Sequence, residues 1–95
     1  MTLAPDFDAL LNRLLSGDLR PLFVSITKSG SNPMILIARI DIAFALSNDK
    51  IADRLSALRA GLDMLTASGY VVSPENTALW NQAIAELNFP DEVKL

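Results

Sequence analysis

The chain has 95 residues and a net charge of −3, and 51% of its residues are hydrophobic while 20% are charged. It contains no His and no Cys, which excludes disulfides and thiol chemistry and leaves general acid–base work to carboxylates, Lys or Tyr. A chain of this length forms a single domain, residues 1–95. Its net negative charge argues against a nucleic-acid partner, because phosphate backbones bind basic surfaces.

The first predicted element is a helix over residues 6–16. Its apolar residues recur at helical spacing and form one face, made of Phe7, Leu10, Leu11, Leu14 and Leu15. Asp6 is expected to accept hydrogen bonds from the free amides of the first turn. Gly17 is expected to end the helix in the left-handed conformation.

Residues 22–28 predict a short strand, because apolar positions alternate with others at a period of two and several residues are β-branched. Residues 33–46 fit two templates. Every even position of this segment is apolar, as in a strand, but Ile37, Ile40 and Phe44 keep helical spacing. The segment is far longer than a usual strand, and its three alanines favour a helix.

We expect a helix over residues 33–46, since Asn32 followed by Pro33 also fits an N-cap and a first helical position. The alternative is a β-hairpin over residues 22–42 with its turn at 29–33. These two interpretations lead to different fold classes.

The clearest helix is predicted over residues 49–68, with Ser47 or Asn48 as its N-cap and Gly69 as its end. Its apolar residues follow the 4-3-4-3 spacing of packed helices: Ile51, Leu55, Leu58, Leu62 and Leu65. Gly61 lies inside this helix, where Gly costs roughly 1 kcal/mol relative to Ala. Close approach of another backbone would explain it, but we expect plain tolerance.

The last helix follows a short extended link at residues 70–72. Ser73 is its predicted N-cap and Pro74 its first residue. Trp80 lies on its apolar face, where we expect a core position. The tail, residues 91–95, is expected to be loosely held.

These elements predict a mainly α fold, a single small domain of about four helices to which residues 22–28 add a short β element. The alternative is an α+β fold in which the hairpin over residues 22–42 is packed by three helices. The choice between them depends on residues 33–46, which we expect to be helical.

No group of residues predicts catalysis, cofactor binding or metal binding. Asp49 and Asp53 are one helical turn apart, and we expect both to be solvated carboxylates in a first helical turn. Neither a calcium loop nor a phosphate-binding motif is present. We therefore expect a protein that is not an enzyme and holds no cofactor or metal. A ligand site completed by another chain, with Asp41 or Asp63 as its polar group, is a further alternative.

Residues 51–71 resemble the outline of winged helix-turn-helix transcription regulators. The segment contains Ile-Ala-x-x-Leu, then Leu-x-x-Leu, then Gly-Tyr-Val where a wing would begin. The resemblance implies DNA binding through a shortened winged-helix segment, which is our alternative function. The segment from Ile51 to Gly69 is about one helical turn shorter than that pattern needs. Arg59 is one of few side chains in this segment that could contact DNA.

The preferred function is a non-catalytic protein–protein interaction or assembly module. A small chain that is half apolar cannot easily bury all of its apolar side chains, and contiguous apolar surface marks interfaces. We expect a homo-oligomer, first of all a dimer, with a heterologous protein partner as the other option. The candidate interface residues are Ile51, Leu55, Leu58, Leu62, Leu65 and Trp80.

Sequence signals for export or membrane insertion are not found. No basic residue precedes Arg13, which does not fit a secretory signal. The apolar run at residues 34–46 contains Arg39 and Asp41 and is too short to span a bilayer. We therefore expect a cytoplasmic protein without a membrane partner.

Overall fold

A computed structural model describes residues 4–28 and 32–95. These residues form five α-helices and one short 3₁₀ helix, and no strand occurs among them. The elements are α1 (Phe7–Ser16), α2 (Arg20–Lys28), α3 (Pro33–Ser47), α4 (Arg54–Ala67), α5 (Pro74–Glu86) and η1 (Asp91–Val93). The mainly α prediction is confirmed, and the predicted β element is not supported.

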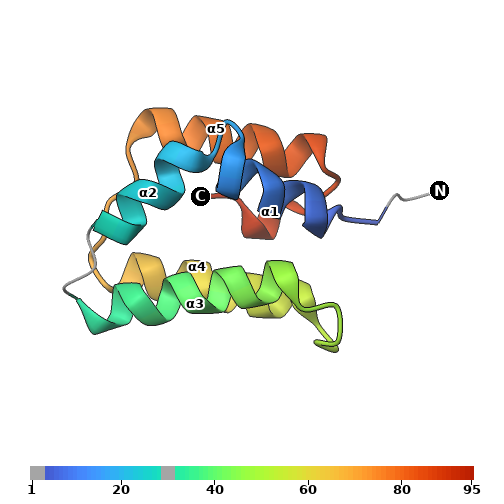
Figure 1. Ribbon diagram of the computed structural model, residues 1–95, viewed down its shortest axis with the longest axis horizontal. Coiled ribbons are helices and arrows are strands. Elements are labelled where there is room, and N and C mark those ends of the chain that lie inside the picture. Colours follow the sequence, from blue (N-terminus) through green and yellow to red (C-terminus); the bar gives the residue numbers. More distant parts are fainter. Residues whose placement is uncertain (1–3, 29–31) are drawn as a thin grey trace.

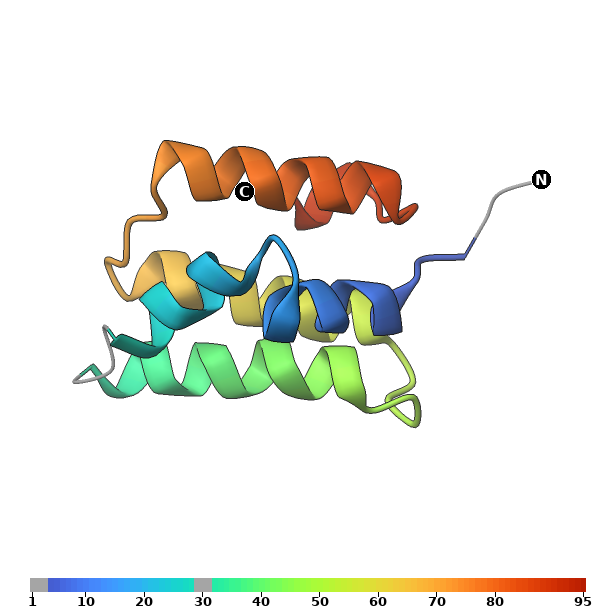
Figure 2. The ribbon, with the colours of Figure 1, turned by 45° about the horizontal axis from the view of Figure 1, so that its top comes forward.

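The helices form two layers. α3 and α4 lie side by side and antiparallel in one layer, and they make the most extensive helix–helix contact among the described residues (Figure 1). α1, α2 and α5 lie in a second layer over one face of this pair (Figure 1). The hydrophobic core lies between the layers. The opposite, outer side of α3 has no described helix over it (Figure 2).

The first helix agrees with its prediction at the start but not at the end. Asp6 accepts a hydrogen bond from the Ala9 amide at 3.0 Å. Gly17 is extended, with φ −102° and ψ −152°, so the predicted left-handed end is wrong. A Cβ at Gly17 would lie 2.8 Å from the Cα of Arg13. Lack of space for a side chain, not a left-handed backbone, therefore favours Gly here.

The strand predicted at residues 22–28 is wrong, because this segment belongs to α2. Leu19, Leu22 and Ile26 are all buried, and their spacing of three and four puts them on one side of a helix. The alternation of apolar residues in so short a segment fitted both periods. A two-stranded hairpin is only marginally stable in water, whereas α2 satisfies its backbone hydrogen bonds locally.

The helix expected at residues 33–46 is confirmed by α3. The Asn32 side chain accepts a hydrogen bond from the Met34 amide at 2.9 Å, and Pro33 occupies the first turn. The alternative hairpin over residues 22–42 is therefore contradicted, since both of its arms are helical. Residues 29–31 of its predicted turn lie outside the described residues.

α4 begins later than predicted, at Arg54. Asp53 is its N-cap and accepts a hydrogen bond from the Ser56 amide at 3.0 Å. The predicted cap, Asn48, instead follows α3, and its side chain accepts from the Lys50 amide at 3.0 Å. The residues between these two positions are needed to turn the chain between antiparallel helices. The predicted end at Gly69 is confirmed, with φ +88°.

Gly61 marks the closest approach of α3 and α4, so the expectation of plain tolerance is wrong. A Cβ at this position would lie 2.8 Å from Cγ1 of Ile42, 3.1 Å from its backbone nitrogen and 3.3 Å from Cβ of Asp41. These distances are shorter than ordinary van der Waals contacts. The missing side chain therefore allows the two helix backbones to pack closely.

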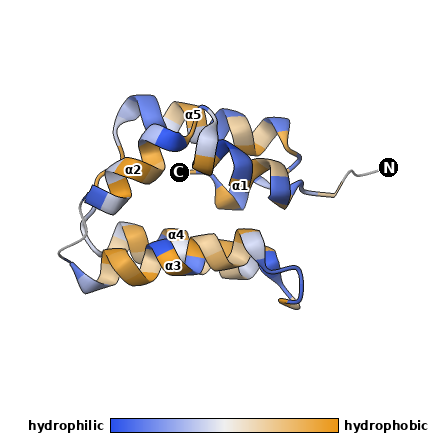
Figure 3. Cartoon of the chain, viewed as in Figure 1, coloured by the Kyte–Doolittle hydropathy of each residue, from blue (hydrophilic) through white to orange (hydrophobic). Residues whose placement is uncertain are grey.

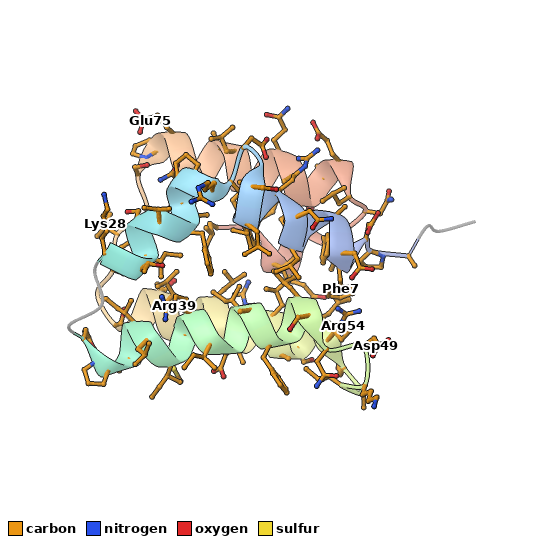
Figure 4. The ribbon with its side chains drawn as sticks, in the orientation of Figure 1. Phe7, Lys28, Arg39, Asp49, Arg54 and Glu75 are labelled. Atoms are coloured by element: carbon orange, nitrogen blue, oxygen red, sulfur yellow. The ribbon has the colours of Figure 1, made fainter. Side chains whose placement is uncertain are left out.

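Arg54, the first residue of α4, contacts both α3 and α1. Its guanidinium donates hydrogen bonds to the carbonyls of Ala45 at 2.9 Å and Leu46 at 2.8 Å, in the last turn of α3. It also lies 4.0 Å from the ring centroid of Phe7, a residue of α1 (Figure 4). Cations are favoured at helix C-termini and over aromatic rings, so this residue holds the end of α3 against α1 and α4.

The tail is firmly held, contrary to the prediction for residues 91–95. Val93 is fully buried, and its carbonyl accepts a hydrogen bond from the Trp80 indole N–H at 2.9 Å. The Asn81 side chain donates to the Leu95 carbonyl at 3.0 Å and accepts from the Leu95 amide at 2.8 Å. Arg59 donates to the Glu92 carbonyl. The sequence predicts a loose tail because terminal residues are usually poorly ordered, but the backbone groups of this tail bind side chains of α4 and α5.

Candidate interaction surface

The six predicted interface residues lie mostly within the chain's own core. Four of them are at most 4% exposed: Leu58, Leu62, Leu65 and Trp80. Ile51 precedes α4 and is partly buried, and Leu55 packs against the core from the first turn of α4. These residues hold α4 and α5 to the rest of the molecule. A large apolar surface for a partner has to come from other residues.

Exposed apolar surface is concentrated on α3. Seven large hydrophobic side chains are exposed among the described residues, and five of them belong to this helix. Four of these five share its outer side, and we call them the α3 stripe: Leu36, Ile37, Ile40 and Phe44, with exposed fractions of 42, 47, 53 and 55%. Figure 3 shows hydrophobic residues along most of α3. Figure 4 shows side chains projecting from its outer side.

The α3 stripe exists because α3 is apolar on both sides. Its inner side is buried against α4 and the second layer by Ile35, Ala38, Ile42, Ala45 and Leu46. Residues three and four apart lie on one side of a helix, which places the stripe opposite these inner residues. A helix that is hydrophobic all round is normally buried all round. The outer side of α3 therefore resembles core surface that no described part of the chain covers.

Charged groups flank the α3 stripe but do not interrupt it. Arg39 is half-buried, and its guanidinium donates a hydrogen bond to the Thr27 hydroxyl of α2 at 3.2 Å. Figure 4 shows this side chain directed toward the second layer. Asp41 lies at the other edge, beside Gly61 of α4. A partner that contacts the centre of the stripe would therefore meet only apolar side chains.

The predicted pair of carboxylates, Asp49 and Asp53, does not share a helical turn, because both residues precede α4. Asp53 is engaged as the N-cap and also accepts from the Ser56 hydroxyl at 2.8 Å. The hydrogen bond from the Ser56 backbone amide, and then the one from its hydroxyl, lower the pKa of Asp53. The Asp53 carboxylate therefore has a structural role as the N-cap of α4.

The cavities of the described chain offer little for a small ligand. The interior contains a cavity of about 10 Å³ lined by core residues such as Leu22, Trp80 and Leu65, which is room for roughly one water molecule. Two shallow clefts of about 420 and 370 Å³ border α4. Arg59 lines both clefts and forms an ion pair with Asp63 at 3.0 Å. The main charged groups of these clefts therefore already bind one another.

Within residues 4–28 and 32–95, no group of three or more His, Cys, Asp or Glu residues is placed to hold a metal ion. Among the same residues, none of the helices has the length and apolar character that crossing a membrane requires. The segment that resembles a winged helix-turn-helix, residues 51–71, contains one continuous helix, α4, and no turn between two helices. DNA binding stays an untested prediction.

Comparison of the chain with protein-family models, with curated proteins and with solved structures finds no match. Function is therefore inferred from the residues and the geometry of this chain alone.

The α3 stripe was not among the predicted interface residues, although the sequence contained a signal for it. Residues 33–46 fitted both a period of two and a helical period, which happens when apolar residues occur on every side. For a helix, such a pattern indicates burial on both sides. A chain of 95 residues has few elements with which to cover both sides of a helix, so the other side of α3 was a candidate surface.

Proposed function

We propose that the chain is a non-catalytic protein–protein interaction or assembly module and that the α3 stripe is its binding surface. The observation that supports this proposal is the concentration of exposed apolar side chains on one helix: Leu36, Ile37, Ile40 and Phe44 are each about half exposed. Scattered apolar residues are normal on protein surfaces. A contiguous apolar patch is a typical feature of an interface.

The spacing of the residues in the α3 stripe limits the kind of partner that can cover it. An apolar row with residues three and four apart is the pattern by which helices pack against one another or into grooves. Helix α3 spans 15 residues, which corresponds to a length of roughly 22 Å. A partner that presents a helix or an apolar groove of similar length would cover the stripe. As part of this proposal the protein is cytoplasmic, because a chain without Cys fits a reducing compartment.

A photocrosslinking amino acid at position 40 tests this proposal in the cell that makes the protein. The matched control carries the same amino acid in place of Glu75, which is exposed on α5 (Figure 4). We expect illumination to join the chain to another protein molecule from position 40, either a copy of itself or a different protein, and not from position 75. Equal yields of adducts from both positions, or none from position 40, would contradict the proposal.

A further inference from the structure

We infer that the partner of the α3 stripe is a second copy of this chain, packed antiparallel about a two-fold axis that passes next to Ile40. This inference rests on the proposed function and names its partner. It is carried by three features of the stripe: the symmetry of its residue positions, its lack of charge, and its length and area.

When Ala43 is counted with the stripe, its positions are symmetric about Ile40, which is the middle residue of the 15-residue helix. Leu36 and Ile37 lie one turn before it, and Ala43 and Phe44 one turn after it, at the same distances of four and three residues. When two such helices cross antiparallel at Ile40, a residue that precedes the centre meets the residue that follows it by the same number of positions. Leu36 then meets Phe44 of the second copy.

The same geometry separates the two copies of Phe44 and brings Ile37 against a small residue. Ile37 meets Ala43 of the second copy, which is half-buried. In a parallel arrangement each residue would instead face its own copy, so that Phe44 would meet Phe44 while Ala43 would meet Ala43. Bulky residues would hold the helices apart where the small ones leave a gap. The antiparallel arrangement gives the more even packing.

The charge distribution also fits a second copy. A two-fold contact brings the same surface of both copies together, so a charged group near the axis would be close to a group of like charge. The chain has a net charge of −3, yet none of the four stripe residues is charged. Arg39 is turned toward Thr27, and Asp41 lies at the α4 edge. The stripe is therefore a face that can meet itself without repulsion at its centre.

The apolar area of the α3 stripe determines how tightly two copies are expected to bind. Four half-exposed side chains provide on the order of 300–400 Å² of apolar surface per copy. A second α3 has the same length as the first and covers the stripe from end to end. The area buried by both copies stays below the range of stable standard interfaces, so we expect a dimer that forms at micromolar or higher concentration and exchanges rapidly.

Single-cysteine variants test the arrangement, because the chain has no Cys of its own. Helix axes in contact are about 8–10 Å apart, which brings facing Cα atoms within the range of about 4.4–6.8 Å that a disulfide spans. Ile40→Cys should therefore form a disulfide-linked dimer under mild oxidation. Phe44→Cys alone should not, but a mixture of Phe44→Cys with Leu36→Cys should form a mixed dimer. Glu75→Cys, on α5, is the control and should form no disulfide-linked dimer.

Solution mass provides the second measurement. We expect sedimentation equilibrium to show a monomer–dimer equilibrium for the unmodified chain that persists at high salt, since it depends on apolar contact. Ile40→Asp should raise the dissociation constant of the dimer at least tenfold. Because Ile40 is exposed, this variant should keep its helical circular dichroism, which separates loss of association from loss of folding.

Three results would overturn the inference. A monomer at all concentrations, with no disulfide-linked dimer of Ile40→Cys, would exclude the second copy. Efficient self-cross-linking of Phe44→Cys would exclude the antiparallel arrangement. Dimers that Ile40→Asp does not weaken would place the contact elsewhere. If only the first result occurs and the photocrosslinker at position 40 still captures a different protein, the proposed function stands and the second copy is wrong.

Discussion

The contact between Gly61 and Ile42 leads to a prediction whose direction is opposite to the usual rule. Replacing Gly by Ala inside a helix ordinarily stabilises by roughly 1 kcal/mol, because Ala loses less backbone entropy. In Gly61→Ala the new methyl would lie 2.8 Å from Cγ1 of Ile42 and 3.1 Å from its backbone nitrogen. Neither atom is the free end of a flexible side chain, so the helices must move apart.

The magnitude follows from two opposing effects. Forcing an extra methyl group into a packed contact costs about 1–3 kcal/mol, and the middle of this range exceeds the helix-propensity gain by about 1 kcal/mol. We expect the free energy of unfolding of Gly61→Ala to fall by about 1 kcal/mol. In a domain of this size such a loss lowers the melting temperature by about 4–8 °C.

Urea unfolding monitored by circular dichroism measures this change, and two further variants make it specific. Ala60→Gly, at the exposed neighbouring position, calibrates the helix-propensity effect in the same helix. Ile42→Ala removes the Cγ1 atom that the methyl would contact, so Gly61→Ala should be less harmful in that background. If Gly61→Ala stabilises the chain by as much as Ala60→Gly destabilises it, the close approach of α3 and α4 is wrong.

Three other predictions concern stability. Trp80→Phe leaves the buried Val93 carbonyl without its donor and should lower the free energy of unfolding by about 2 kcal/mol; an unchanged urea midpoint would contradict this contact. Arg54→Met removes two hydrogen bonds to α3 and the contact with Phe7. Thermal melts should show that the free energy of unfolding falls by about 2 kcal/mol. Arg54→Lys should not restore it, because Lys lacks the planar guanidinium that donates both hydrogen bonds. The pKa of Asp53 is lowered by its hydrogen bonds from Ser56, so the stability from the ionised cap is fully present above the ordinary pKa and is lost as pH falls through the lowered one. Asp53→Asn keeps a capping oxygen and should show a smaller decrease in melting temperature below about pH 4; an identical pH profile would argue against the cap.

The helices that could be predicted from the sequence are those in which spacing and capping residues agree. Asp6 and Asn32 both precede an apolar period and both accept the expected backbone hydrogen bond. α2 was missed because residues 22–28 are too few to separate a period of two from a helical one. Including Leu19, which is buried three residues before Leu22, would have favoured the helix.

The candidate surface could not be predicted by looking for the most regular apolar row. The row in α4 is regular because it packs against the rest of the chain, and Leu58 at its centre is fully buried. The row on the outer side of α3 was hidden among apolar residues on its inner side. Regular spacing identifies a face that is buried, but only the tertiary arrangement shows whether the chain itself or a partner buries it.

The binding of the tail to Trp80 has a consequence for the order in which the protein matures. Synthesis proceeds from the N-terminus, so residues 91–95 leave the ribosome after all five helices. Until then the indole N–H has no acceptor from Val93, and the contacts of η1 with α4 and α5 are absent. Protection of a nascent chain from proteases should therefore appear only after residues 91–95 have emerged.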